Sequence, residues 1–149
     1  MASVLPGDVE FEAAFSVARA SQTNLARFYL RALELKEVGG DPCLVPSEDA
    51  ETVNTEHILP ENPGKKWGKI DPEVAKAYYK RIGNLALLAA SVNTSIGNNG
   101  FADKKPFLKQ SDFRLTKAVA NSQEWGVAEI EARQKKLAAL AVKTWPLRS

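Results

Sequence analysis

The sequence predicts an α+β fold that is mostly α-helical and has a short β-hairpin near its centre. Apolar side chains recur at helical spacing near both ends of the chain, over residues 8–38 and 122–144. Between these regions, residues 52–58 and 82–89 are short stretches rich in strand-forming or apolar residues. A hairpin of these two strands followed by a helix, with further helices before and after it, accounts for all of these observations.

The chain has 149 residues, which fits one domain with a core that needs no metal or disulfide cross-link. We divide this single domain, residues 1–149, into a helical hairpin (1–40), a hairpin-helix core with an inserted helix (50–101), and a basic segment with a long C-terminal helix (102–149). The one cysteine, Cys43, excludes an internal disulfide and a cysteine-rich zinc site.

The sequence contains neither a predicted membrane segment nor a recognisable signal peptide. No apolar run approaches the roughly 20 residues that span a membrane, and the first residues lack the pattern of a signal peptide. We therefore expect a cytoplasmic protein without a membrane segment. An N-terminus with no obvious start signal of its own is also compatible with a fragment of a longer protein.

Residues 1–40 contain two predicted helices. In the first, over residues 8–20, Phe11 and Phe15 share one face, and acidic residues occupy the first turn, where the helix dipole favours them. The second helix begins near residue 21 or 23 and ends at the glycine pair 39–40. We expect the two helices to pack against the rest of the chain.

The central part holds the polar residues of most interest. Its first strand contains Glu56 and His57. Asp71-Pro72 is a good start for the inserted helix, because aspartate can cap it and proline suits its first position. The second strand contains Asn84 near its start, and the helix after it carries Asn93 in its first turn.

Charge is distributed unevenly along the chain. Residues 1–62 carry 11 acidic and 4 basic side chains, whereas residues 63–149 carry 7 acidic and 16 basic ones. A polyanion would therefore be met by the C-terminal part, through contacts from lysine and arginine to phosphates. The alternative is that these charges only keep helix faces solvated. The candidate contacts to a phosphate backbone are Lys65, Lys66, Lys104, Lys105 and Lys109.

His57 is the only histidine in the chain. An unperturbed imidazole titrates near pH 6.5, so it can accept a proton near neutrality. A hairpin packed on a helix would bring Glu56, His57 and Asn93 to one small surface, where oxygen ligands from Glu56 and Asn93 suit a hard cation such as Mg²⁺. Asn84 could tie down the loop around the histidine. These pieces suit phosphodiester hydrolysis, which needs a base and a cation.

Simpler interpretations of each residue remain. His57 could be a packing histidine and Glu56 a surface carboxylate. Asn84 could be a turn residue, and Asn93 a residue that bonds to the backbone at a helix start. The lysines could be solvated charges.

The residues resemble a known superfamily. Glu56-His57-Ile58-Leu59-Pro60, Ile82-Gly83-Asn84-Leu85, Asn93 and Phe101-x-x-Lys104 are similar to the motif of the HNH (ββα-metal) nucleases. The similarity is strongest to the HNH domain at the C-terminus of GmrSD-type, modification-dependent restriction enzymes and of related phosphorothioate-sensing (SspE-like) anti-phage nucleases. The order and spacing also resemble the HNH domain of RNA-guided CRISPR nucleases. The resemblance covers roughly residues 50–146.

The resemblance implies a role for each motif residue. His57 would be the general base that deprotonates the attacking water, and Asn84 would fix the loop and the orientation of the histidine. Glu56 and Asn93 would bind Mg²⁺ or Mn²⁺. Lys104 would contact the scissile phosphate, and Arg133 would serve structure more than chemistry. Glutamate in place of the common aspartate, and asparagine in place of histidine at the last position, are departures from many relatives.

Two functions follow from the sequence, beside a third interpretation as a helical interaction domain whose match to the motif is accidental. The first is a metal-dependent DNA endonuclease or nickase of HNH type with low sequence specificity, the effector of an anti-phage or modification-dependent restriction system. Relatives usually carry an N-terminal sensor and nucleotide-hydrolysing domain, which this chain lacks, so a separate or fused partner of that kind is expected. The alternative is a non-catalytic DNA-binding module with a degenerate HNH fold.

Overall fold

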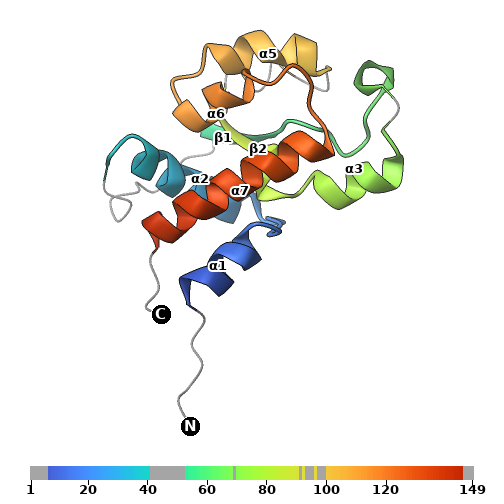
Figure 1. Ribbon diagram of the computed structural model, residues 1–149. Helices are drawn as coiled ribbons and strands as arrows, with labels where there is room; N and C mark the ends of the chain where they lie inside the picture. Colours follow the sequence, from blue (N-terminus) through green and yellow to red (C-terminus); the bar gives the residue numbers. More distant parts are fainter. Residues whose placement is uncertain are drawn as a thin grey trace.

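The computed structural model describes residues 7–40, 53–68, 70–90, 92, 96 and 100–145. Its elements are, in chain order, α1 (Asp8–Phe15), α2 (Thr23–Glu37), β1 (Val53–His57), η2 (Lys65–Trp67), α3 (Pro72–Tyr78), η3 (Ile82–Asn84), β2 (Leu85–Ala89), α5 (Phe101–Lys109), α6 (Arg114–Val119) and α7 (Val127–Thr144). Figure 1 shows α7 crossing the molecule, with α1 below it and α5 and α6 above it. The fold is α+β and mostly helical, as the sequence predicts.

The two strands form the predicted hairpin. They pair antiparallel from Val53 opposite Ala89 to His57 opposite Leu85, and this is the whole sheet in the described part of the chain. β2 begins at Leu85 and not at residue 82. The three residues before it form a 3₁₀ turn, in which the backbone N–H of Asn84 donates to the carbonyl of Arg81 at 2.8 Å.

Three described residues lie between β2 and Gly100. They are Ala90, Val92 and Ile96, and all three are helical. Asn93, the predicted metal ligand on this stretch, lies outside the described residues. The specific ββα-metal arrangement therefore stays a prediction.

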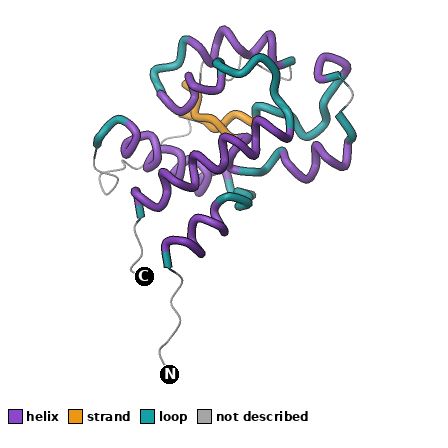
Figure 2. The backbone as a smooth tube through the Cα atoms, in the orientation of Figure 1, coloured by secondary structure: helices purple, strands orange, loops and turns teal. Residues whose placement is uncertain are grey.

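Helices cover both faces of the hairpin, as Figure 2 shows for the two strands at the centre of the fold. Alternate residues of a strand point to opposite faces. Leu85 and Leu87 of β2 pack into a core cluster with α2 and α7, and Ala86 and Leu88 pack into another with α5, α6 and Trp125. Since both of its faces are buried, β2 lies inside the core, whereas the residues of β1 other than Glu56 are half-buried.

Several predicted elements have different bounds in the structure. α1 ends at Phe15, because the chain then turns and residue 19 makes an isolated bridge to residue 81. The basic segment, to which no helix was assigned from the sequence, folds into α5 and α6. α7 begins at Val127, directly after Gly126, and not at residue 122. The predicted start of α3 is confirmed, since the side chain of Asp71 accepts from the backbone N–H of Glu73 at 2.8 Å.

Candidate active site

Glu56 and His57 are the last two residues of β1, and their side chains leave the strand on opposite faces. Glu56 is buried, 9% exposed, on the face that packs against α5. His57 is half-buried and meets Tyr79, the residue after α3. We call these the Glu56 face (Glu56, Ala86) and the His57 face (His57, Leu85), following the cross-strand pairs.

The Glu56 face contains a buried ion pair. Lys104 of α5 is 1% exposed, and its Nζ lies 3.4 Å from Oε1 of Glu56. The same ammonium donates to the carbonyls of Ile58 at 3.0 Å and His57 at 3.1 Å, and it lies 5.6 Å from the ring centroid of Trp67. Three oxygen acceptors match the three donors of an ammonium group.

Burial controls the ionisation of this pair. Burial raises the pKa of Glu56 and lowers the pKa of Lys104, since each loses solvent around its charged form. Their mutual attraction opposes both shifts. A buried ion pair persists only when further hydrogen bonds satisfy its charges, and the two carbonyls supply these to Lys104.

The structure corrects the sequence-based prediction for Lys104. A side chain that is 1% exposed and bonded to protein acceptors is not on a DNA-facing surface. The reason is its position on α5: Phe101, Lys104 and Leu108 recur at helical spacing and are the buried residues of that helix. The same spacing in the sequence could have identified this buried face.

His57 lies in a different environment. Its ring centroid is 5.0 Å from that of Tyr79, and the Nζ of Lys80 lies 5.6 Å from the Tyr79 ring. Burial, followed by the charges of Lys104 and Lys80, lowers the pKa of His57, and Glu61 opposes the shift. The imidazole is therefore neutral near pH 7, which is the form that accepts a proton.

Asn84 holds the loop that follows His57. Its side chain is fully buried and makes four hydrogen bonds to described residues. Oδ1 accepts from the backbone N–H of Leu59 at 2.8 Å and from the indole N–H of Trp125 at 3.0 Å. Nδ2 donates to the carbonyls of Leu59 and Tyr79, both at 2.9 Å. Since two donors meet Oδ1 and two acceptors meet Nδ2, the amide has one satisfactory orientation. A part in catalysis stays a prediction for this residue.

Helix α7 supports the turn around Asn84 from below. A Cβ on Gly83 would come within 2.4 Å of the carbonyl oxygen of Ile130, so this turn needs glycine. Arg133 donates from Nη1 to the carbonyls of Gly83 at 2.9 Å and Leu85 at 2.6 Å, which is the structural role expected for it. Burial lowers the pKa of Arg133 to about 10.

Gln134 is a supporting residue that the sequence did not reveal. Its Oε1 accepts from the backbone N–H of Gly83, and its Nε2 donates to the carbonyls of Phe15 and Ala18. It therefore joins η3 to the N-terminal helix. A polar residue at a core position of an amphipathic helix is the signal that could have indicated it.

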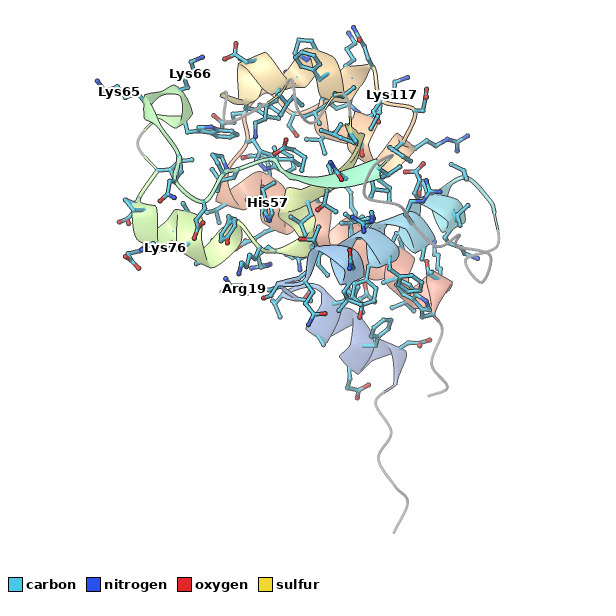
Figure 3. All side chains as sticks on the ribbon, turned by 180° about the vertical axis from the view of Figure 1, so that it is seen from behind. Arg19, His57, Lys65, Lys66, Lys76 and Lys117 are labelled. Atoms are coloured by element: carbon cyan, nitrogen blue, oxygen red, sulfur yellow. The ribbon has the colours of Figure 1, made fainter. Side chains whose placement is uncertain are left out.

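The other lysines predicted to contact DNA are exposed or half-buried. Lys65 and Lys66 are exposed on η2, and Lys66 pairs with Asp103 at 3.2 Å. Lys105 and Lys109 line a groove of about 590 Å³ between α5 and α6, together with Lys117. In Figure 3, Lys65 and Lys66 lie at one side of the molecule, Lys117 at the other, and His57 between them.

The donor set for a metal is small among the described residues. They contain no group of three or more histidine, cysteine, aspartate or glutamate side chains that could hold an ion. Glu56 supplies one carboxylate, and Mg²⁺ is commonly held by one or two carboxylates with waters and substrate phosphates completing its shell. The carboxylate of Glu56 is an oxygen donor of this kind, and in this structure it is paired with the ammonium of Lys104.

A family comparison adds to this geometry. The family described as "GmrSD restriction endonucleases, C-terminal domain" matches residues 5–140, which is most of the chain. The chain belongs to this family. The recognition made from the sequence motif is thereby confirmed. No curated protein and no solved structure gives a significant match.

Membership places this GmrSD C-terminal domain in a family of restriction endonucleases, and it implies DNA as the substrate class. It does not assign chemistry to individual residues. None of the helices that the structure describes is long and apolar enough to cross a bilayer.

Proposed function

We propose that this chain is a metal-dependent DNA endonuclease or nickase of HNH type, with His57 as general base and low sequence specificity. It is the effector of a bacterial anti-phage or modification-dependent restriction system, and a separate or fused N-terminal sensor or nucleotide-hydrolysing domain directs it. One observation carries this proposal: the only histidine of a restriction-endonuclease family domain is half-buried at the end of β1, and hydrogen bonds with Asn84 hold the loop that follows it.

The proposed step is the hydrolysis of a phosphodiester. His57 takes a proton from water, the water oxygen forms a bond to phosphorus, and the bond from phosphorus to the leaving oxygen breaks. Mg²⁺ or Mn²⁺, when bound through Glu56 and Asn93, would neutralise the charge that develops on the phosphate. Asn84 contributes through the backbone of Leu59, since its bonds fix the path of the chain directly after His57.

The edge of β1 is where both faces could reach one phosphate. Among the described residues, β1 pairs only with β2, so its other edge has no strand neighbour. A phosphate at this edge would be accessible to His57 from one face and to a cation at Glu56 from the other. A phosphate at this edge would therefore allow His57 and Glu56 to act on the same bond, although their side chains leave β1 on opposite faces.

The test is plasmid nicking with Mg²⁺ or Mn²⁺. We expect His57→Ala to lower the cleavage rate about 10²- to 10⁴-fold, the usual contribution of a general base. Added imidazole should restore part of the activity in this variant and leave the wild type unchanged. Equal cleavage by both proteins would remove His57 from the mechanism.

The alternative, a non-catalytic DNA-binding module, is favoured by the Glu56–Lys104 contact, since an ammonium already neutralises the proposed metal ligand. Salt-sensitive DNA binding without metal-dependent cleavage of supercoiled, linear or modified DNA would support this alternative.

A further inference from the structure

A set of cations lies at and after the end of α3, on the face of the hairpin that carries His57 and opposite Lys104. The Tyr79 ring is 5.0 Å from the imidazole of His57, and the Nζ of Lys80 is 5.6 Å from that ring. Arg19 Nη2 donates to the carbonyl of Lys76 at 3.3 Å, so its guanidinium lies at the end of α3. We call this set the Tyr79 surface: Arg19, Lys76, Tyr79 and Lys80. In Figure 3, Lys76 and Arg19 lie on the side of β1 toward which His57 points.

The backbone places these residues together although they are far apart in the sequence. The N–H of Ala20 donates to the carbonyl of Lys80 at 2.9 Å, and Arg19 forms an isolated antiparallel bridge with Arg81. The side chain of Arg81 turns inward, where it donates to Gln134 at 2.8 Å and to the carbonyl of Ser16 at 2.9 Å. Arg19 is exposed and Lys80 is half-buried, so both remain at least partly exposed.

Within the described residues, neither Lys80 nor Arg19 has a carboxylate within ion-pair distance. Lys76 pairs with Glu73 at 4.0 Å, and both side chains are mostly exposed, so this pair is weak. Glu61 is the exposed acid whose charge reaches His57. The charge of Lys80 also acts at His57, in agreement with the short path through Tyr79.

We propose that Lys80 and Arg19 bind phosphates of the DNA backbone on the Tyr79 surface and so place the scissile phosphate beside His57. The inference rests on the proposed function and names the residues that hold the substrate at that site. An ammonium binds phosphate as a point charge, and a guanidinium can bind it through two donors.

This proposal differs from the predicted contacts on α5. Lys105 and Lys109 line a groove between α5 and α6, two helices that cover the Glu56 face. Lys80 and Arg19 lie on the His57 face. The proposal therefore assigns the substrate-positioning contacts to the side of the hairpin that carries the base.

Equilibrium binding of a labelled short DNA duplex, measured in EDTA over a range of NaCl concentrations, tests the proposal. We expect Lys80→Ala and Arg19→Ala each to weaken binding about tenfold and to lower the slope of log Kd against log salt by about 1, because each phosphate contact releases about one counterion. Lys80→Arg should keep most of the slope, and Glu61→Gln should tighten binding.

Lys143→Ala is the matched control. Lys143 is exposed in the last turn of α7, and Figure 1 shows this end of the helix far from α3. We expect this variant to bind like the wild type. Thermal unfolding of each variant reports whether its fold is intact.

Unchanged affinity and slope in Lys80→Ala and Arg19→Ala would overturn the proposal, and so would a loss of the same size in Lys143→Ala or a wild type that does not bind DNA. Failure of the proposed function looks different. If Lys80→Ala weakens binding but the wild type shows no metal-dependent cleavage, the DNA contact stands and the hydrolysis fails. If His57→Ala abolishes cleavage while Lys80→Ala binds normally, the hydrolysis stands and the contact fails.

Discussion

The two faces of the hairpin each hold a lysine close to the end of β1, and the two lysines are in opposite situations. Lys104 is 1% exposed and its ammonium contacts three protein oxygens. Lys80 is half-buried, and its ammonium lies over the ring of Tyr79. A lysine thus stabilises the interior on the Glu56 face, whereas on the His57 face a lysine remains available to a ligand. The two lysines differ because three protein oxygens lie within hydrogen-bond distance of Lys104. Their distances from His57 along the sequence do not explain the difference.

The largest expected difference between the two lysines is in their contribution to the free energy of unfolding. We expect Lys104→Met to lower the free energy of unfolding by about 3 kcal/mol or more, because it leaves Glu56 as a buried carboxylate without its partner. Lys80→Met, the same substitution on the other face, should cost less than about 1 kcal/mol. Urea denaturation measures both. Equal losses would contradict the contrast between the two faces.

A smaller effect concerns the coupling between Glu56 and Lys104. In the double variant Glu56→Gln, Lys104→Met, no uncompensated charge remains, so part of the loss caused by Lys104→Met should be recovered. We expect a coupling free energy of about 1–3 kcal/mol from the double-mutant cycle. Additive effects of the two substitutions would show that Lys104 serves only the carbonyls of His57 and Ile58.

The smallest expected effect is on pH dependence, and it arises on the His57 face. The pKa of His57 is lowered from 6.5 by burial and by nearby positive charge. Since the neutral imidazole is the base, kcat/KM should rise as His57 loses its proton, and the midpoint of this rise should lie below pH 6.5. Lys80→Met removes a positive charge and should move the midpoint upward. A wild-type midpoint above 6.5 would be incompatible with this environment.

The sequence predicted the parts of the fold that depend on local signals. The apolar periodicity of α2, the Asp71-Pro72 start of α3 and the pairing of the two strands are all present. The predicted start of β2 was wrong. The turn at Gly83 is set by its contact with α7 and not by the secondary-structure propensity of residues 82–84. A contact between segments so distant in sequence leaves no local signal.

The site shows the same division. The motif in the sequence identified Glu56, His57 and Asn84 as special, and the bonds of Asn84 to the loop after His57 are of the kind that the resemblance implied. The burial of Lys104 was not predicted, because Lys104 belongs to a basic segment of the sequence and its match to a lysine of the family motif implied a contact with phosphate. Tyr79 and Lys80 were missed because only the folded chain brings them close to His57, and no sequence pattern links them to it.

The hydrogen bonds that α7 and the segment before it make have a consequence for how the chain folds during synthesis. Asn84 accepts from the indole N–H of Trp125, and Gln134 joins Gly83 to the carbonyls of Phe15 and Ala18. None of these bonds can form until residues 125–134 have left the ribosome, and contacts between such distant segments form late in folding. The hydrogen-bond network around the loop after His57 is therefore completed only when residues 125–134 have been translated, so this region of the fold is assembled late in synthesis.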